Sequence, residues 1–223
     1  GDVLLGSVFY ALVLYIFVQL WQVLGLSPGF MPDGLGLREL VWYLAASEAI
    51  MLGRAPIASE VSDEVKSGAI AYSLGRPYNY LGFKLSSYWG DTALRMTVNV
   101  VIGTTVALAA VGPIQVGPGR LVLWGITAAL ALTLNFLIVV CISLSAFWVE
   151  DTGPFFWIYS KLLFVLGGLF APIDLYPQFL RRVAAASPFN LVLYAPAKLL
   201  VAFDAATFAR TVMMQAVWLL VLG

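Results

Sequence analysis

Long apolar runs, separated by short polar segments, dominate the chain. A helix needs roughly 20 apolar residues to cross about 30 Å of hydrocarbon, so runs of this length predict membrane-spanning helices. We predict six spans, at residues 3–26, 40–58, 92–112, 121–148, 155–172 and 210–223. We expect the first run to be a span and not a cleaved signal peptide, because it lacks a basic flank and is too long. The pattern predicts an all-α polytopic membrane protein with a single transmembrane domain over residues 1–223.

The connections between these spans fall into two kinds, and the difference predicts the orientation. Residues 26–36 and 112–119 are short turns rich in Gly and Pro that contain no basic residue. The longer connection over residues 59–91 contains three basic residues. Because cytoplasmic loops carry an excess of Lys and Arg, we expect this connection to face the cytoplasm. Alternation of the spans then places residues 173–209 on the outside.

The segment that follows the second span repeats with the period of a helix. Its apolar residues are Ile57, Val61 and Val65, and its charged residues are Glu60, Asp63, Glu64 and Lys66. This spacing is typical of a short amphipathic helix that ends near Gly68. The spacing fits two arrangements: a helix that lies on the membrane surface, or a helix that sits in a groove of a soluble partner and passes force to the spans.

Residues 66–78, KSGAIAYSLGRPY, bring charge, glycine and an Arg-Pro pair into the same connection. Pro77 disfavours helical geometry at Arg76, so we expect a bend after the short helix. We also expect Arg76 and Lys84 to reach lipid phosphates or a carboxylate of a partner. Residues 57–90 are therefore predicted to be a cytoplasmic segment on which another protein acts.

The connection between the fifth and sixth spans is too apolar for a solvated linker. Pro177, Pro188 and Pro196 divide it into pieces of eight to eleven residues, which are too short to span. Such pieces suit short helices that enter the outer leaflet and return, which requires that they be buried in protein or line a cavity. Arg181 and Arg182 lie in this segment, where the bias of basic residues toward the cytoplasm is weaker because the loop is long.

Composition agrees with a bilayer protein and excludes several functions. Hydrophobic residues make up 61% of the chain and charged residues 11%, against about 25% charged in soluble domains. The 12 basic and 12 acidic residues leave no positive excess to hold a nucleic acid. No histidine is present, which removes the commonest general base and metal ligand. No phosphate-binding G-x-x-x-x-G-K-[ST] motif occurs either, so ATP would have to be bound by another chain.

Charged residues inside the predicted spans are candidates for function, because each costs about 2.5 to 3.5 kcal/mol on insertion scales. Arg54 is expected to extend its long side chain to the cytoplasmic interface. For Glu48 two roles stay open: a structural hydrogen bond to a neighbouring helix, or a place lining a transport path. For Lys161 we favour pairing with Glu150 or Asp151 over contact with a substrate.

Two clusters of residues carry a resemblance to a known family. Residues 59–80, an acidic helix followed by SGAIAYSL, GRP and a tyrosine, resemble the cytoplasmic loop of the type-2 ABC exporter permeases. The resemblance is closest to the bacterial branch in which two related permease genes accompany one ATPase gene. Near the C-terminus, AFWVEDTGPFFWI and GGLFAPIDLYPQFLRRVAAASPFNLVLYAPAKLLVAF are similar to the family's pattern around span five and the segment after it.

The resemblance implies six spans with both termini inside, a coupling helix between spans two and three, and re-entrant outer helices between spans five and six. Carried onto this sequence, the coupling helix falls on residues 57–66. The family signature falls on Gly68, Ile70, Leu74, Arg76 and Pro77. The outer helices carry Tyr176, Pro177, Pro188, Phe189, Tyr194 and Pro196.

The resemblance also implies partners. Members work as dimers of permeases with two cytoplasmic ABC ATPase subunits, so ATP and Mg would bind the ATPase and no cofactor would bind this chain. The branch favours a related but different second permease, and an identical one is the alternative. The implied location is the bacterial inner membrane.

We therefore expect the permease subunit of an ATP-driven exporter. Aromatic and aliphatic spans without a polar cluster favour a lipid-like or amphipathic cargo over an ion or a sugar. Acidic residues are expected to meet basic groups on the ATPase, and Val61 and Val65 to fill its groove. The alternatives are a secondary transporter, for which paired intramembrane carboxylates are missing, and an intramembrane enzyme, for which no nucleophile lies beside a base.

Overall fold

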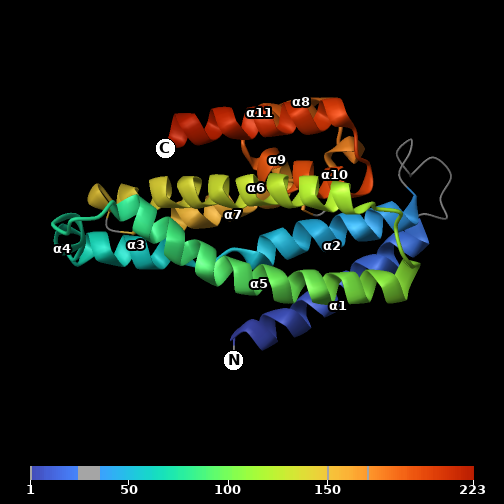
Figure 1. Ribbon diagram of the computed structural model, residues 1–223, viewed down its shortest axis with the longest axis horizontal. Helices are drawn as coiled ribbons and strands as arrows, with labels where there is room; N and C mark the ends of the chain where they lie inside the picture. Colours follow the sequence, from blue (N-terminus) through green and yellow to red (C-terminus); the bar gives the residue numbers. More distant parts are fainter. Residues whose placement is uncertain (1, 25–35, 150, 170) are drawn as a thin grey trace.

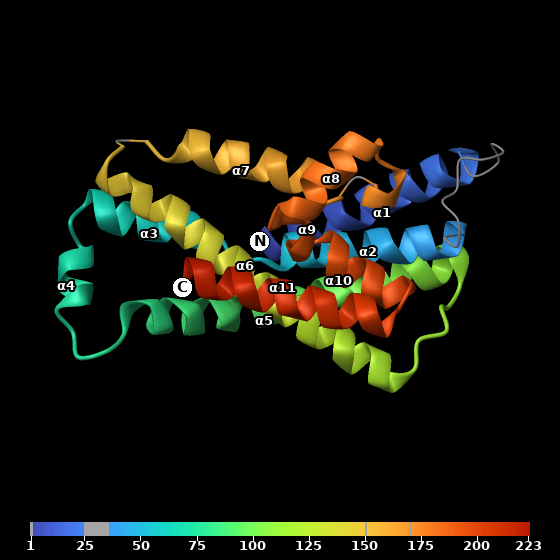
Figure 2. The same ribbon diagram turned by 90° about the horizontal axis from the view of Figure 1, so that it is seen from above.

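The computed structural model describes residues 2–24, 36–149, 151–169 and 171–223, and the regular structure in these ranges is entirely helical. The longer helices run side by side along one axis (Figures 1 and 2). They are α1 (Asp2–Leu24), α2 (Leu37–Gly53), α3 (Ile57–Lys66), α4 (Ile70–Leu74), α5 (Tyr80–Val111), α6 (Pro118–Leu144), α7 (Gly153–Leu166), α8 (Gln178–Ala186), α9 (Phe189–Val192), α10 (Tyr194–Val201) and α11 (Ala205–Leu222), with 3-10 turns η1 (Ser145–Phe147) and η2 (Ile173–Leu175).

Three helices in the described part are long and apolar enough to cross a membrane: α5, α6 continued through η1, and α11. Two shorter apolar helices, Val8–Leu20 within α1 and Gly153–Leu166, have the composition of spans without the length. α11 ends on the side of α3 and α4, and α1 begins near the middle of the long axis (Figures 1 and 2). The all-helical class is confirmed, and the count of six spans stays a prediction.

Several predicted boundaries move. The second predicted span, residues 40–58, ends as α2 at Gly53, because Pro56 cannot donate a backbone hydrogen bond and disfavours helical geometry at Ala55. The third does not start at residue 92, since α5 already begins at Tyr80 and runs for 32 residues. At 1.5 Å per residue this is about 48 Å, which is longer than the hydrocarbon core. One end of α5 therefore extends beyond the bilayer.

The last two predicted spans also change. The fifth, residues 155–172, is replaced by the 14-residue α7, which stops at Leu166. Gly168 follows with a φ of 70°, a conformation that favours glycine and turns the chain out of the helix. The sixth starts earlier than residue 210, because the carboxylate of Asp204 accepts a hydrogen bond from the Thr207 N–H and caps α11.

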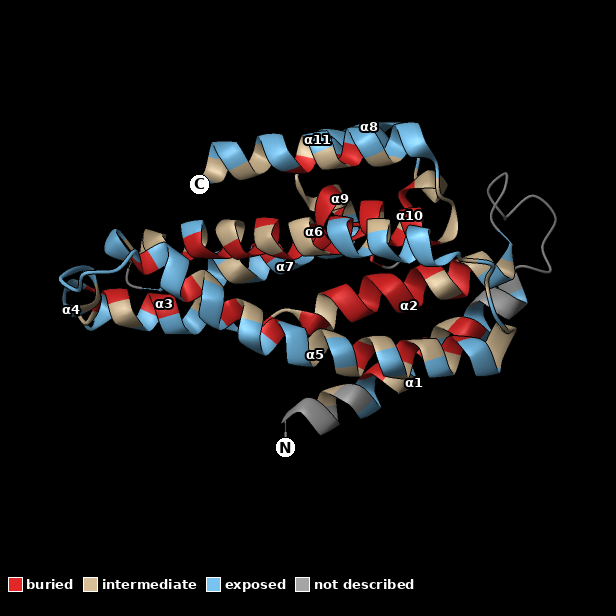
Figure 3. Ribbon diagram, in the orientation of Figure 1, coloured by how far each residue is buried: buried red, intermediate tan, exposed pale blue. Residues whose placement is uncertain are grey.

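α2 is the central helix of the bundle, and Figure 3 shows it buried along most of its length. Residues 43–50 are all buried, and the helix contacts α1, α5 and α10. Two phenols fix its position. The Tyr10 hydroxyl of α1 donates to the Ala45 carbonyl over 2.7 Å, and the Tyr43 hydroxyl donates to the Gly168 carbonyl just after α7. α2 is thus tied to the helices on both of its sides.

Close packing of α1 against α5 depends on a glycine. A Cβ atom placed on Gly103 would collide with the Tyr10 hydroxyl, whose side chain is fully buried. Small residues at helix crossings allow this kind of approach in membranes. Gly125 of α6 has nothing within 4 Å of the same position and offers a matched comparison.

We expect Gly103→Ala to destabilise the fold by about 1 to 3 kcal/mol, because the Tyr10 ring must move and its hydrogen bond to Ala45 is lost. Thermal unfolding of the purified chain in mild detergent measures this. Gly125→Ala should leave the midpoint nearly unchanged. Tyr10→Phe should reduce the effect of Gly103→Ala, and an equal cost in both backgrounds would contradict the explanation.

Candidate functional site

α3 and α4 form one end of the bundle, beyond the break that follows α2 (Figures 1 and 2). The bounds of α3, Ile57–Lys66, agree with the predicted helix. Gly68 has a φ of 74°, which ends α3 and turns the chain into α4. Ile70, 6% exposed, packs with Val65 and Tyr80 and closes the turn from inside.

The apolar face of α3 is filled by its own chain. The exposed fractions of Ile57, Val61 and Val65 are 4%, 0% and 8%, and α3 packs mainly on α6. This corrects the expectation that Val61 and Val65 fill a groove of an ATPase. It also excludes a helix whose apolar face lies on the membrane surface, since neither lipid nor a partner can reach a face that α6 already covers.

Two of the three acidic residues of α3 are paired within the chain. Lys84 of α5, only 2% exposed, forms ion pairs with Glu60 and with Glu64, the latter over 2.7 Å. The Tyr80 hydroxyl donates to the other oxygen of Glu64 over 2.7 Å. Lys84 therefore does not extend to lipid phosphates, and Glu64 is largely enclosed, whereas the Glu60 side chain is 52% exposed and its contact with a partner stays a prediction. Of these acidic residues, Asp63 is left exposed without an ion pair in the described part of the chain.

The Glu64 carboxyl has a lowered pKa. Burial alone would raise the pKa, but hydrogen bonds from Lys84 and Tyr80 and the charge of Lys84 outweigh that effect and bring it below the ordinary 4.5. Sequence analysis missed this arrangement. The sequence signal for this arrangement is the spacing of Tyr80 and Lys84, which lie about one helical turn apart. No local sequence pattern, however, places these two residues against α3.

The outward side of this end carries charged and large apolar side chains, which we call the coupling surface. It consists of Asp63, Lys66, Tyr72, Leu74, Arg76 and Pro77. Tyr72 is 83% exposed and Leu74 is 61% exposed. The Arg76 guanidinium lies 3.4 Å from the Tyr78 hydroxyl, to which it donates, and otherwise faces outward. The predicted signature residues Leu74, Arg76 and Pro77 are thus on the surface, whereas Ile70 supports the turn.

The charged residues that were predicted inside the spans have different surroundings in the structure. Arg54 does not extend to the interface: it donates a hydrogen bond to the Asn135 side chain of α6 over 2.9 Å. Glu48 is 8% exposed and forms no hydrogen bond or ion pair with the residues that the structure describes. The ammonium of Lys161 lies 5.5 Å from the centre of the Trp157 ring. The predicted pairing of Lys161 with Asp151 is wrong, because that carboxylate instead accepts from the Gly153 N–H; Glu150 lies outside the described residues.

The segment after α7 is folded into short helices. Pro177 and Pro188 precede α8 and α9 as expected, and Phe189 opens α9. Pro196 does not break a helix, because it occupies the first turn of α10, where a missing N–H is tolerated. The chain bends instead at Leu193, which separates α9 from α10. α10 packs on α2 and α6 and is largely buried in protein, whereas α8 is largely exposed, with Ala184 as its buried residue.

An ion pair holds the start of this segment against α10. Lys198 lies 2.7 Å from Asp174 of η2, and the Tyr194 hydroxyl donates to the same carboxylate over 2.9 Å. The Tyr176 hydroxyl donates to the Val165 carbonyl at the end of α7. These contacts fix the turn that leads from α7 to α8.

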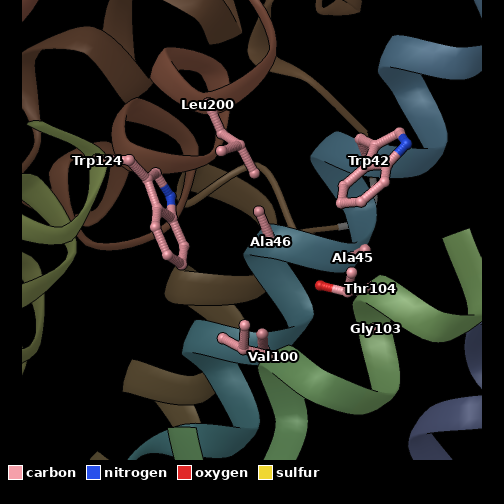
Figure 4. Close-up of a pocket in the computed structure, with 9 residues that line it drawn as sticks. Trp42, Ala45, Ala46, Val100, Gly103, Thr104, Trp124 and Leu200 are labelled. Atoms are coloured by element: carbon pink, nitrogen blue, oxygen red, sulfur yellow. The ribbon is translucent and has the colours of Figure 1, made fainter. Parts of the chain in front are cut away.

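A small cavity lies between α2, α5, α6 and α10 (Figure 4). Its volume is about 30 Å³, the share of one water molecule in the liquid. Trp42, Val100, Trp124 and Leu200 are among the side chains around it, and Glu48 is not. At this point the four helices therefore leave room for about one water molecule and not for a cargo molecule.

We expect Lys84→Met to loosen α3 from α5 by about 1 to 3 kcal/mol, because two carboxylates lose their common hydrogen-bond donor. In the wild type the lowered pKa of Glu64 contributes stability that is present above about pH 4.5 and is lost as the pH falls through the lowered value. Lys84→Met should reduce that loss. Thermal midpoints measured between pH 3 and pH 7, roughly the range over which carboxylates titrate, test this, with the exposed Lys66→Met as control; an unchanged acid dependence would contradict it.

Comparison with known proteins identifies the family of the chain. Residues 33–223 match the family model described as ABC-2 family transporter protein. No curated protein and no solved structure matches the chain. The match covers most of the chain, including α2, the α3–α4 end and the segment after α7. The chain therefore belongs to the ABC-2 family of transporter proteins, as a membrane-embedded subunit of type-2 ABC permease character.

Proposed function

We propose that this chain is the permease subunit of an ATP-driven exporter and that a separate ABC ATPase acts on its coupling surface. The observation that carries the proposal is the exposure of Tyr72 and Leu74, 83% and 61%, at the tip of the α3–α4 end. Large apolar side chains beside charged ones are typical of protein contacts. Membership of the transporter family supports the same partner.

The support beneath the coupling surface favours transmission of force. α3 is tied to α5 through Lys84, as described above. It is tied to α6 because the Ser143 hydroxyl donates to the Ala58 carbonyl over 3.2 Å. It is tied to the start of α7 because the Thr152 hydroxyl donates to Ser62 over 3.1 Å. A displacement of α3 would thus act on three helices at once.

The proposed cycle begins with ATP and Mg binding to two ATPase subunits in the cytoplasm. Their closure would press on the coupling surface, move α3, and open a path between two permeases toward α8–α10. The second permease would be a related chain, or a second copy of this one, in a bacterial inner membrane. The closed bundle around the small cavity of Figure 4 then corresponds to a resting state.

The proposed cargo is a lipid-like or amphipathic molecule. Outward-facing side chains of the apolar helices are largely aliphatic or aromatic, as in Val101, Ile126 and Phe164. Among the described residues, no group of three or more acidic, cysteine or histidine side chains could hold a metal ion. An apolar route between helices suits a molecule with a long hydrocarbon part.

Co-purification from native membranes in mild detergent, with partners identified by mass spectrometry, tests the proposal. We expect an ABC ATPase with the wild type and its loss with the double variant Tyr72→Ala and Leu74→Ala. Truncating a hot-spot residue of an interface weakens binding by about 2 kcal/mol or more. The matched control is Leu121→Ala with Val122→Ala, exposed on α6 at the opposite end.

Both variants should keep the wild-type thermal midpoint, because none of the four side chains is buried. Val61 is unsuitable for this experiment, since a charge at this fully buried position would disrupt the fold and not only the contact. Recovery of the wild type without any ATPase, or proton-driven transport by the isolated chain, would contradict the proposal.

A further inference from the structure

At the break between α2 and α3, the Arg54 side chain forms hydrogen bonds with α2 and with α6. Its Nε donates to the Met51 carbonyl over 2.9 Å, which satisfies one of the carbonyls left free at the end of α2. Its Nη1 donates to Asn135 Oδ1 of α6 over 2.9 Å. On the far side of the break, the Ala55 N–H donates to the Thr92 hydroxyl of α5 over 3.2 Å. Each side of the break is thereby fastened to a neighbouring helix.

Asn135, which accepts the hydrogen bond from Arg54, also forms hydrogen bonds with two further side chains. Its Oδ1 also accepts a hydrogen bond from the Tyr159 hydroxyl of α7 over 2.6 Å. Its Nδ2 donates to the Tyr88 hydroxyl of α5 over 3.3 Å. All three side chains are buried: the exposed fractions of Asn135, Tyr88 and Tyr159 are 2%, 1% and 5%. The cluster thus connects the end of α2 with α5, α6 and α7.

A cluster of this kind fixes the relative positions of the helices more than it stabilises the fold. A single hydrogen bond between membrane helices adds little to stability, and apolar packing can replace a buried polar group without loss. The arginine fork, by contrast, fixes direction, because its donors lie in one plane and reach two acceptors at set angles. A helix interrupted by proline would otherwise bend at this point and absorb a displacement.

We infer that Arg54 is a positioning residue that stiffens the break, so that a displacement of α3 is passed to α2 and is not absorbed by bending. From α2 the displacement reaches the outer segment, because Tyr43 is bonded to the Gly168 carbonyl and α10 packs on α2. Arg54 then links the coupling surface at one end to α8–α10 at the other. This inference rests on the proposed function, since the ATPase supplies the displacement.

Distance measurements on the permease–ATPase complex in lipid nanodiscs test the inference. Spin labels are placed in a Cys141→Ser background, because Cys141 is exposed. One pair joins Ser59 of α3, which lies outside the coupling surface, to Ser86 of α5 and reports the inner end; the other joins Ala185 of α8 to Thr105 of α5 and reports the outer segment. All four positions are exposed. Distances are compared without nucleotide and with ATP trapped by vanadate.

We expect both pairs to change distance with nucleotide in the wild type. In Arg54→Gln the inner pair should still change and the outer pair should not, because the break now bends. The matched control, Tyr159→Phe, removes a hydroxyl from the same cluster but keeps the Arg54–Asn135 bond, and it should behave as the wild type. A merely structural role for Arg54 would not separate the two pairs in this way.

Arg54→Lys keeps the charge but not the fork, and it provides a second test if Arg54→Gln does not assemble. It should show a reduced change at the outer pair. An outer change of wild-type size in either variant would overturn the inference while leaving the proposed function intact. Absence of an ATPase, or of any nucleotide-dependent change in the wild type, would overturn both.

Discussion

An interrupted helix inside an apolar bundle must satisfy the backbone groups that the interruption frees, and this constraint organises the structure. Where water does not reach these groups, protein groups have to supply the partners. At the break after α2, Arg54 takes a free carbonyl and Thr92 takes a free N–H. Because these partners come from the break itself and from α5, the break fixes where α3 leaves the bundle. The direction of α3, and with it the coupling surface, follows from that geometry.

Pairing of charges distinguishes two groups among the basic residues of the chain. Lys84 and Lys198 are neutralised by carboxylates within the chain, and Arg54 is held in the polar cluster. Lys66 and Arg76 remain exposed at the α3–α4 end. The first group positions helices, and the second is available to a partner. A count of basic residues in a loop does not distinguish these groups, although the two have different physical roles.

α2 connects the two regions that the proposed function requires. Toward one end it is clasped to α6 through Arg54, and toward the other it holds the turn after α7 through Tyr43. Between these points residues 43–50 are all buried, and Figure 3 shows α2 red over most of its length. A helix packed in this way is suited to move as a rigid body, because close-packed interiors have low compressibility and transmit strain. α2 therefore provides a packed connection between the two ends of the bundle.

Local patterns in the sequence determined the helical class, the bounds of α3, and the short helices after α7. Apolar periodicity, Gly68 and the proline positions act within a few residues, so they can be interpreted without a fold. Only the tertiary structure decided what those elements contact. Val61 repeats with the same period whether α6, lipid or a partner covers it, and Lys84 meets Glu60 across 24 residues of chain. Arg54 likewise forms a hydrogen bond with Asn135, which lies 81 residues later in the sequence. Side-chain partners at such separations depend on how helices pack, which no local pattern encodes.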